Sequence, residues 1–384
     1  MRRTPLAWLN LTHDRRRLAL ALAGIGFAVL LMCMELCFRQ ALFDSTVAVI
    51  RHMKADLVIT SRAQYTIIVR ETFDRLRLAQ ALGCPAVASA APLYIETRRS
   101  TLKNRKTGEA LPIRVLAFNP DRPVFDMPEV ESRLADLRLP DRALFDEKSK
   151  QEYGDIVPKA APIELSGHDL KVVGLFSLGT DFANDGNLIT SDVTYQRLFP
   201  TFTGQDPLDQ VDFGLLRLKP GSNVREVQRE LSSRLPEDVT VLTKQEFESQ
   251  ERSFWETSTP IGYIFWIGTL MGFIVGSVIC YQILYTDVAD HLPEFATLKA
   301  MGYANRYFIW VILQEAVLLS IFGFVPGVIS SEIICRIVAM LTGLKVGVHA
   351  VTALVVLLMS VVMCIVSGSL TVRKVMAVDP AELF

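Results

Sequence analysis

Side chains that could support catalysis are scattered along this chain rather than grouped in a motif. The sequence has no Gly-x-x-x-x-Gly-Lys-Ser/Thr stretch, and no glycine is followed directly by lysine, which excludes a P-loop for ATP. It has no His-Glu-x-x-His, and its five histidines lie far apart. Gly167-His168-Asp169 has the composition of a turn, with Ser166 as a hairpin residue rather than a nucleophile. We therefore expect a chain that is not an enzyme, with no catalytic residues and no cofactor of its own.

One acidic stretch faintly resembles a calcium-binding loop. Its oxygen-bearing residues and its glycine fall at positions 1, 5, 6, 7 and 12 of such a loop, and they are Asp181, Asp185, Gly186, Asn187 and Asp192. Position 3, however, is Ala183, and the last position lacks the bidentate glutamate that calcium loops use. We therefore expect a polar turn here and no metal site.

Four polar side chains lie inside otherwise apolar stretches, namely Glu35, Gln282, Gln314 and Glu315. Polar groups are costly in lipid, so such residues usually face a neighbouring helix or a cavity. Glu315, at the middle of its stretch, is the best candidate for a contact between helices, whereas Glu35 lies near the end of its stretch and can reach water. The two glutamines can hydrogen-bond across helices. We favour structural roles over substrate contact for all four.

The apolar stretches that carry these residues are long enough to cross a membrane. The chain has 384 residues, of which 50% are hydrophobic, and a mean hydropathy of +0.30. A membrane-spanning helix needs about 20 apolar residues, and the stretches that meet this length are 18–38, 261–285, 307–325 and 350–370. Pro326 should bend or end the third span. Residues 326–349 are therefore expected to form a bent helix extension, with Glu332 and Arg336 as an i,i+4 pair, and an outer loop.

Lysine and arginine in the short connections predict the orientation of these spans. The N-terminal tail, residues 1–17, contains five arginines and can form an in-plane helix, and the C-terminal tail, residues 371–384, contains two basic residues. Both tails and the loop 286–306 are therefore expected in the cytoplasm. The segment 39–255 is expected outside it. A net charge of -1 gives no indication of a nucleic-acid partner.

The segment outside the membrane alternates β-rich runs with amphipathic helices, which indicates a large α+β domain. Thr72–Leu82 and Asn223–Leu235 have helical periodicity. Val211–Leu218, the second of these helices and Val239–Leu242 form a strand–helix–strand unit that leads directly into the second span. Further strands are expected at Ala55–Thr60, Pro112–Phe118 and Leu170–Phe176. The predicted fold is thus a protein of four transmembrane helices with this domain between the first and the second.

The cytoplasmic loop 286–306 has the pattern of a short amphipathic helix. Apolar residues recur every three or four positions, at Val288, Leu292, Phe295, Leu298 and Met301. Asp290 can cap this helix, Pro293 is tolerated in its first turn, and Gly302 can end it. The residues alone leave two interpretations open, a helix that lies at the membrane interface and a docking helix for a cytoplasmic partner.

The layout of one span, a large outside domain and three further spans resembles that of the MacB/FtsX-type permeases of ABC systems. Glu294–Gly302 is similar to their signature after the second span, and Gln314–Ala316 with Phe322–Gly327 is similar to their third span. The tail 373–384 also fits. The DevC permeases of the DevBCA exporter are the branch that the chain resembles most, and Tyr281–Leu292 is the most specific stretch for that branch.

This resemblance implies a homodimeric permease of the bacterial inner membrane, paired with a separate ATPase of the DevA or MacB kind that would bind ATP and Mg²⁺. The outside domain would have a porter-plus-sabre arrangement and dock a DevB-like periplasmic adaptor that engages a TolC-like outer-membrane channel. The cargo would be a lipid, a glycolipid or another amphiphile. The loop helix would receive the ATPase stroke, through Asp290, His291, Leu292, Glu294, Phe295, Leu298, Lys299, Met301 and Gly302.

Two other functions stay open at this point. A signalling scaffold like FtsX would pass ATPase motion to a cell-wall hydrolase, although its outside domain is usually smaller. A permease of the Lol kind would release lipoproteins. The partner proteins, rather than any residue of this chain, distinguish these functions from an exporter.

Overall fold

Two compact units make up the chain in the computed structural model, which describes residues 15–200, 206–342 and 346–377. A helical unit comprises Met1–Ala41, Pro260–Leu341 and Val346–Phe384, and an α+β unit comprises Leu42–Thr259 with Thr342–Lys345. The fold class predicted from the sequence, four membrane helices with a large α+β domain inserted after the first, is therefore confirmed.

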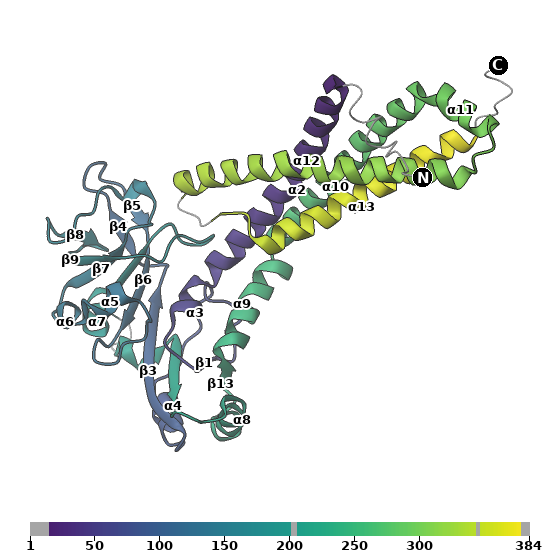
Figure 1. Ribbon diagram of the computed structural model, residues 1–384. Coiled ribbons are helices and arrows are strands. Elements are labelled where there is room, and N and C mark those ends of the chain that lie inside the picture. The colour runs from purple at the N-terminus through teal and green to yellow at the C-terminus, as the bar shows by residue number, and fades with distance from the viewer. Residues whose placement is uncertain (1–14, 201–205, 343–345, 378–384) are drawn as a thin grey trace. The chain divides into compact units, whose positions relative to one another are not determined.

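Four long helices form the helical unit (Figure 1), and each is long and apolar enough to cross a membrane. They are α2 (Arg15–Thr46), α10 (Pro260–Asp290), α12 (Asn305–Thr342) and α13 (Ala350–Ala377). The predicted spans lie within these helices, and each helix extends beyond its predicted span. The first helix continues past Phe38 to Thr46, and the third continues past Val325 to Thr342, where a helix extension was expected.

Pro326 lies inside α12, and the helix runs on beyond it to Thr342. A proline removes one backbone donor, and a helix within a bundle can tolerate that loss. Pro326 also touches α2, because a Cβ on Gly26 would lie 3.5 Å from its ring. The expected pair between Glu332 and Arg336 is present on the continuation, with 2.8 Å between Oε1 and Nε. The second Glu332 oxygen accepts a hydrogen bond from the Val348 backbone N–H.

Two rows of glycines let α10 and α12 approach α2 closely. On α12, a Cβ on Gly323 would lie 2.6 Å from the Ile25 side chain, and one on Gly327 would lie 2.7 Å from the Gly26 carbonyl oxygen. On α10, Gly272 faces Met32 in the same way, and Gly276 faces Ala28 at 2.6 Å. Glycines spaced four apart on one helix are typical of close packing between membrane helices.

The order of these contacts gives the direction of each helix. Along α12, the later glycine meets the later residues of α2, so these two helices run parallel. Along α10, the later glycine meets the earlier residue of α2, so these two run antiparallel. Successive membrane helices in this unit therefore alternate in direction, as the predicted spans require.

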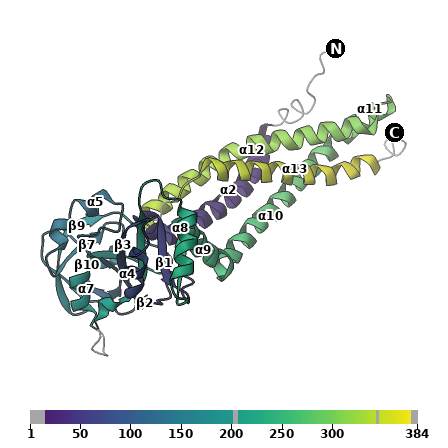
Figure 2. The same ribbon diagram turned by 90° about the horizontal axis from the view of Figure 1, so that it is seen from below.

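One mixed sheet forms the centre of the α+β unit, with the strand order β13-β1-β12-β3-β6-β10-β7-β9-β8-β4-β5. Figure 2 shows this unit with β1, β3, β7, β9 and β10 of the sheet labelled. A small separate sheet pairs β2 with β11. The strands are β1 (Leu57–Ser61), β2 (Phe73–Asp74), β3 (Val87–Glu96), β4 (Thr101–Lys103), β5 (Ala110–Pro112), β6 (Arg114–Phe118), β7 (Arg142–Asp146), β8 (Ile163–Leu165), β9 (His168–Phe176), β10 (Asn187–Ser191), β11 (Gln210–Val211), β12 (Phe213–Leu218) and β13 (Val239–Thr243).

Short helices connect and cover these strands. They are α3 (Ala48–His52), α4 (Leu76–Leu82), α5 (Pro128–Glu131), α6 (Leu134–Leu137), α7 (Asp192–Leu198), α8 (Val224–Arg234) and α9 (Lys244–Thr257), with the 3-10 turns η1 (Gln151–Tyr153) and η2 (Pro207–Asp209). Buried side chains of the sheet alternate between two apolar clusters, since Leu57 and Ile59 belong to one cluster and Val58 to the other. This alternation is expected of a sheet that is covered on both faces.

The strand–helix–strand unit predicted from the sequence is present as β12, α8 and β13, and Asn223 caps α8 as its position suggested. The two strands are not neighbours, because β1 lies between them and pairs antiparallel with both. The predicted helix Thr72–Leu82 was wrong at its start, where Phe73 and Asp74 pair with β11. Ser166 and Gly167 both have positive φ in the turn between β8 and β9, which confirms the hairpin.

The glycine contacts generate a testable prediction for the helical unit. Gly327→Leu places a side chain where the α2 backbone already lies, and overpacking of this kind costs about 1–3 kcal/mol. We expect the full-length protein in detergent to lose several degrees of thermal stability, as measured by size-exclusion chromatography after heating. Gly347→Leu is the matched control, because nothing lies within 4 Å of that position. Equal melting of both variants would contradict the close-packing argument.

Candidate functional site

The connection between α10 and α12 contains the short helix α11 (Leu292–Ala300). Its beginning differs from the prediction, because Asp290 is the last residue of α10 and His291 occupies the N-cap position without a side-chain cap. Asp290 therefore does not cap α11, since helix α10 continues through it. Pro293 lies in the first turn, as predicted, and Glu294 contacts the His291 ring at 3.3 Å between Oε2 and Nδ1.

Gly302 ends α11 as the sequence predicted. Its φ of +92° is a left-handed conformation that favours glycine. Its N–H donates to the Lys299 carbonyl at 3.0 Å, and the Tyr303 N–H donates to the Leu298 carbonyl at 3.2 Å. This pair of bonds is a Schellman motif, which stops the helix and sets the direction in which the chain leaves it. The short helix therefore has a sharply defined end before α12 begins.

The apolar stripe predicted on this segment does not form one surface. Val288 is buried at the end of α10 in a cluster with Phe308 and Ile312 of α12, and Leu298 packs against that cluster. Met301, by contrast, is 64% exposed. The stripe splits because Leu298 faces the membrane helices of its own chain, whereas Met301 follows the last helical residue and faces away. The side chains of Leu292 and Phe295 lie outside the described residues.

Among the side chains that the structure describes in this segment, the exposed ones are both polar and apolar. Glu294 and Thr297 are exposed along the helix, and Met301 and Tyr303 are exposed after it. Lys299 is half-buried. Tyr303 was missed by the sequence reasoning because it lies beyond the predicted helix. A mixed polar and apolar surface of this kind can bind a soluble partner without being buried in lipid.

The intramembrane polar residues divide into two groups. Glu315 is fully buried in α12, and Glu35 lies against α10, where a Cβ on Gly268 would be 2.5 Å from its carboxyl carbon. Gln282 and Gln314 are exposed on the helical unit, and neither side chain has a hydrogen bond to another helix among the described residues. The expectation of hydrogen bonds between helices thus does not hold for the two glutamines within one chain.

Serine and threonine side chains make polar contacts between helices that the sequence did not indicate. Ser320 of α12 and Ser360 of α13 are 3.0 Å apart, and Ser367 donates to the Ser277 carbonyl of α10 at 2.7 Å. Thr352 donates to the Gln40 side chain at 3.0 Å. Hydroxyl groups are common throughout the spans, so only the helix packing identifies which ones face a neighbour.

The two segments through which the α+β unit continues into membrane helices are joined to each other by charged side chains. Asp44, near the end of α2, accepts from Arg252 of α9 at 3.1 Å and from Arg51 of α3 at the same distance. Arg51 also pairs with Glu248 of α9 at 2.7 Å. Because these residues are partly exposed, each pair alone contributes little to stability, but the network links the end of α2 to α9.

Helix α9 is also anchored, through a buried carboxylate, on the loop that follows β1. Glu251 is 2% exposed and accepts hydrogen bonds from Thr66 Oγ1, the Ile67 N–H and Trp255 Nε1, each at 2.9 Å. Burial raises the pKa of this carboxyl above its usual value. At the start of the helix, Thr243 and Glu246 form a capping box. Helix α9 is thus fixed at its start and at its middle, in the segment that precedes α10.

The loop that resembled a calcium site is a polar turn, as predicted. The Asp181 carboxylate accepts from the Ala183 and Asn184 N–H groups, each at 2.9 Å, and from Arg114 at 2.6 Å. Asp185 pairs with Lys150 at 2.7 Å. The acidic groups of this loop are therefore engaged by donors of the protein itself.

Two family comparisons cover most of the chain. Residues 18–234 match the MacB-like periplasmic core domain, and residues 264–380 match the FtsX-like permease C-terminal domain. The first match spans 217 of the 384 residues, which is more than half of the chain. Together the two matches follow the same division between the α+β unit and the later membrane helices that the structure shows.

Similar proteins are permeases as well. Uncharacterized ABC transporter permeases of Mycobacterium tuberculosis (strain ATCC 25618 / H37Rv) and Mycobacterium bovis (strain ATCC BAA-935 / AF2122/97) are each 24% identical to this chain over 317 residues, covering 81% of this chain and 79% of theirs.

Two solved structures resemble part of the chain at a low level of similarity. The periplasmic region of MacB from Actinobacillus actinomycetemcomitans has a TM-score of 0.36 and 11% identity, covering 52% of this chain and 94% of that one. The extracellular domain of the noncanonic ABC-type transporter YknZ from Gram-positive bacteria has a TM-score of 0.32 and 12% identity, covering 49% and 99%.

The anchoring of α9 can be tested by hydrogen exchange on the full-length protein. Glu251→Ala leaves three buried donors without their acceptor, and each such loss costs about 1–3 kcal/mol. We expect amide exchange in residues 62–72 to accelerate by about tenfold or more, whereas Glu251→Gln, which keeps one acceptor oxygen, should accelerate it less. Glu226→Ala, at an exposed position of α8, is the control. Unchanged exchange in Glu251→Ala would show that this carboxylate does not hold the loop.

Proposed function

Because the chain belongs to the MacB/FtsX family of ABC transporter permeases, we propose that it is the membrane subunit of an exporter that passes the motion of a separate ATPase to a periplasmic domain. ATP and Mg²⁺ would be bound by that ATPase, since the sequence has no P-loop. The cargo would be a lipid, a glycolipid or another amphiphile. We further place the chain in the DevC branch, on the stretch Tyr281–Leu292.

The observation that carries this proposal is the construction of α11. A helix of nine residues lies between two membrane helices, begins directly after α10 and ends at a Schellman motif. Its inner side chain, Leu298, packs on the cluster formed by α10, α12 and α13. A force applied to its exposed side would therefore reach three membrane helices through packed side chains. This property favours a docking helix over a helix that only lies at the interface.

On the periplasmic side, the element that would receive this movement is α9. It precedes α10 in the chain, and Glu251 fixes it on the loop that follows β1. A shift of α10 along its axis would pull on α9 and so on Thr66 and Ile67, which donate hydrogen bonds to that carboxylate. Rigid elements linked by buried hydrogen bonds are suited to transmit such a movement. The cargo then need not pass between the membrane helices.

The remaining partners are part of the proposal. With both termini in the cytoplasm, as the basic tails indicate, the α+β unit would lie in the periplasm and dock a DevB-like adaptor and a TolC-like channel. A second copy of the chain would complete the transport unit. Gln282 and Gln314, exposed on one chain, would then meet a polar partner in the second copy rather than lipid.

Recovery of the complex from membranes tests the docking helix. Met301→Asp places a charge on the exposed side of α11 and should reduce copurification of the ATPase by about tenfold, while the protein itself stays folded. Leu139→Asp, at an exposed apolar residue of the α+β unit, should leave copurification unchanged. Normal recovery and normal ATPase activity with Met301→Asp would contradict the docking role.

The partners recovered with the unmodified protein decide between functions. An ATPase together with a periplasmic adaptor supports the exporter. An ATPase together with a cell-wall hydrolase would instead support the FtsX-like scaffold, and a lipoprotein carrier would support release of the Lol kind. The identification uses mass spectrometry of the complex solubilised in detergent.

A further inference from the structure

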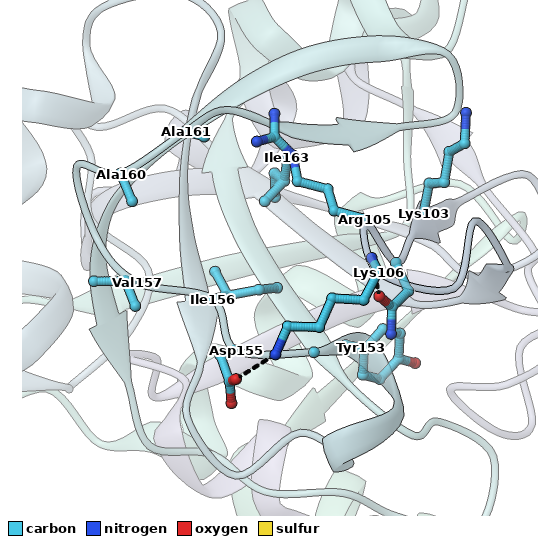
Figure 3. A pocket seen from close by; sticks show the side chains of 12 residues that line it. Lys103, Arg105, Lys106, Tyr153, Asp155, Ile156, Val157, Ala160, Ala161 and Ile163 are labelled. Atoms are coloured by element: carbon cyan, nitrogen blue, oxygen red, sulfur yellow. Dashed lines mark hydrogen bonds and ion pairs between the residues drawn. The ribbon is translucent and has the colours of Figure 1, made fainter.

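A small pocket lies in the α+β unit between the β4–β5 hairpin and the segment 153–163 (Figure 3). Its volume is about 220 Å³. The cationic side chains of Arg105 and Lys106 and the apolar side chains of Ile156, Val157 and Ile163 line it, with Ile163 drawn beside Arg105 and Lys106 reaching toward Asp155. The pocket thus joins a charged edge to an apolar surface, which is the chemistry of an amphiphile.

The charged edge has more cations than carboxylates. Lys103, Arg105 and Lys106 line the pocket, and Asp155 is the one carboxylate among its lining residues. Lys106 pairs with Asp155 at 2.8 Å, while Lys103 pairs with Glu164 at 2.9 Å. Among the described residues, Arg105 is within ion-pair range of no carboxylate. The Arg105 guanidinium can therefore pair with an anion that enters the pocket.

The ion pair between Lys106 and Asp155 can open at little cost. Its side chains are 74% and 85% exposed, and exposed pairs of this kind contribute little to stability. Lys106 can therefore exchange Asp155 for an incoming anion. Lys106 would then be a second cation of the pocket, in addition to Arg105, that can make a charge-assisted contact with an anion.

The hairpin that carries these cations has a defined shape. The Asn104 side chain accepts from the Lys106 N–H at 2.8 Å and donates to the Glu152 carbonyl at 2.6 Å. It thereby links the hairpin tip to the turn at η1. Gly154 follows with a φ of +82°, and a Cβ there would lie 3.4 Å from Asn104. The Tyr153 hydroxyl donates to the Pro112 carbonyl of β5. The two walls of the pocket are thus connected to each other before any ligand binds.

We propose that this pocket binds the anionic head group and the first few carbons of an amphiphile. The volume is below the roughly 300 Å³ at which pockets for whole drug-sized ligands begin, so the rest of the chain would lie outside it. The head group would contact Arg105, with Lys106 as a second cation of the pocket, and the first methylene groups would lie on Ile156 and Val157. This inference rests on the proposed function, from which it takes an amphiphile as the class of cargo. What it adds is that the head group of the cargo is negatively charged.

The test uses the full-length protein in nanodiscs of phosphatidylcholine, without ATPase or ATP. The probes are a photoreactive ten-carbon carboxylic acid, the corresponding phosphate monoester and the corresponding neutral alcohol, each with a diazirine on its chain. Peptides that contain residues 153–163 are quantified by mass spectrometry, and labelling of the membrane helices corrects for partition into lipid. We expect the acid or the phosphate to label this segment about tenfold more than the alcohol does. The stronger of the two identifies the head group.

Two variants of the pocket are expected to change labelling in opposite directions. Arg105→Gln should lower labelling by the anionic probe about tenfold, and Asp155→Asn should raise it about two- to threefold, because Lys106 loses its competing partner. Lys219→Gln, at an exposed lysine outside the pocket, should change nothing. Equal labelling by acid, phosphate and alcohol, or no response to Arg105→Gln and Asp155→Asn, would overturn the pocket assignment. The labelling experiment involves no ATPase. That outcome would therefore not contradict the proposed exporter function, provided that the ATPase and an adaptor still copurify with the protein.

Discussion

The close approach of α2 to its neighbours is the constraint on which the helical unit depends. Lipid is as apolar as the side chains it surrounds, so burial of apolar surface does not hold membrane helices together. Packing contacts must do so instead, and these require backbones that come near one another. Gly272 and Gly276 on α10 and Gly323 and Gly327 on α12 supply that approach. Helix α2 thereby contacts both helices that begin or end at the loop containing α11.

In the α+β unit, the end of α2 is held by a different kind of interaction. Here the end of α2, the helix α3 and the helix α9 are joined by ion pairs and by the buried Glu251 rather than by small residues. A buried carboxylate with three donors is directional and breaks at a high cost. Close-packed glycines in the helical unit and directional hydrogen bonds in the α+β unit thus both hold their elements in fixed positions.

Several features of the chain were predictable because they depend on local sequence. Four apolar stretches of sufficient length indicate membrane helices wherever they occur. Gly302 had to end the loop helix, because glycine best accepts the left-handed conformation that a Schellman motif needs. The α8 helix and the hairpin at Ser166 follow from cap and turn residues in the same way. The family resemblance added the division into a periplasmic core and a permease domain.

Other features depended on contacts between residues far apart in the chain. Leu298 and Met301 follow one helical period, but only the position of α12 and α13 made the first an inner residue and left the second exposed. Phe73 became a strand residue because β11, more than a hundred residues later, lies beside it. Pro326 did not end its helix, and Gln282 and Gln314 face outward. The sequence by itself determined where helices, turns and membrane spans occur, since these follow from composition and local period. Only the tertiary structure decided which side chains are buried, paired or exposed, because that depends on which elements become neighbours.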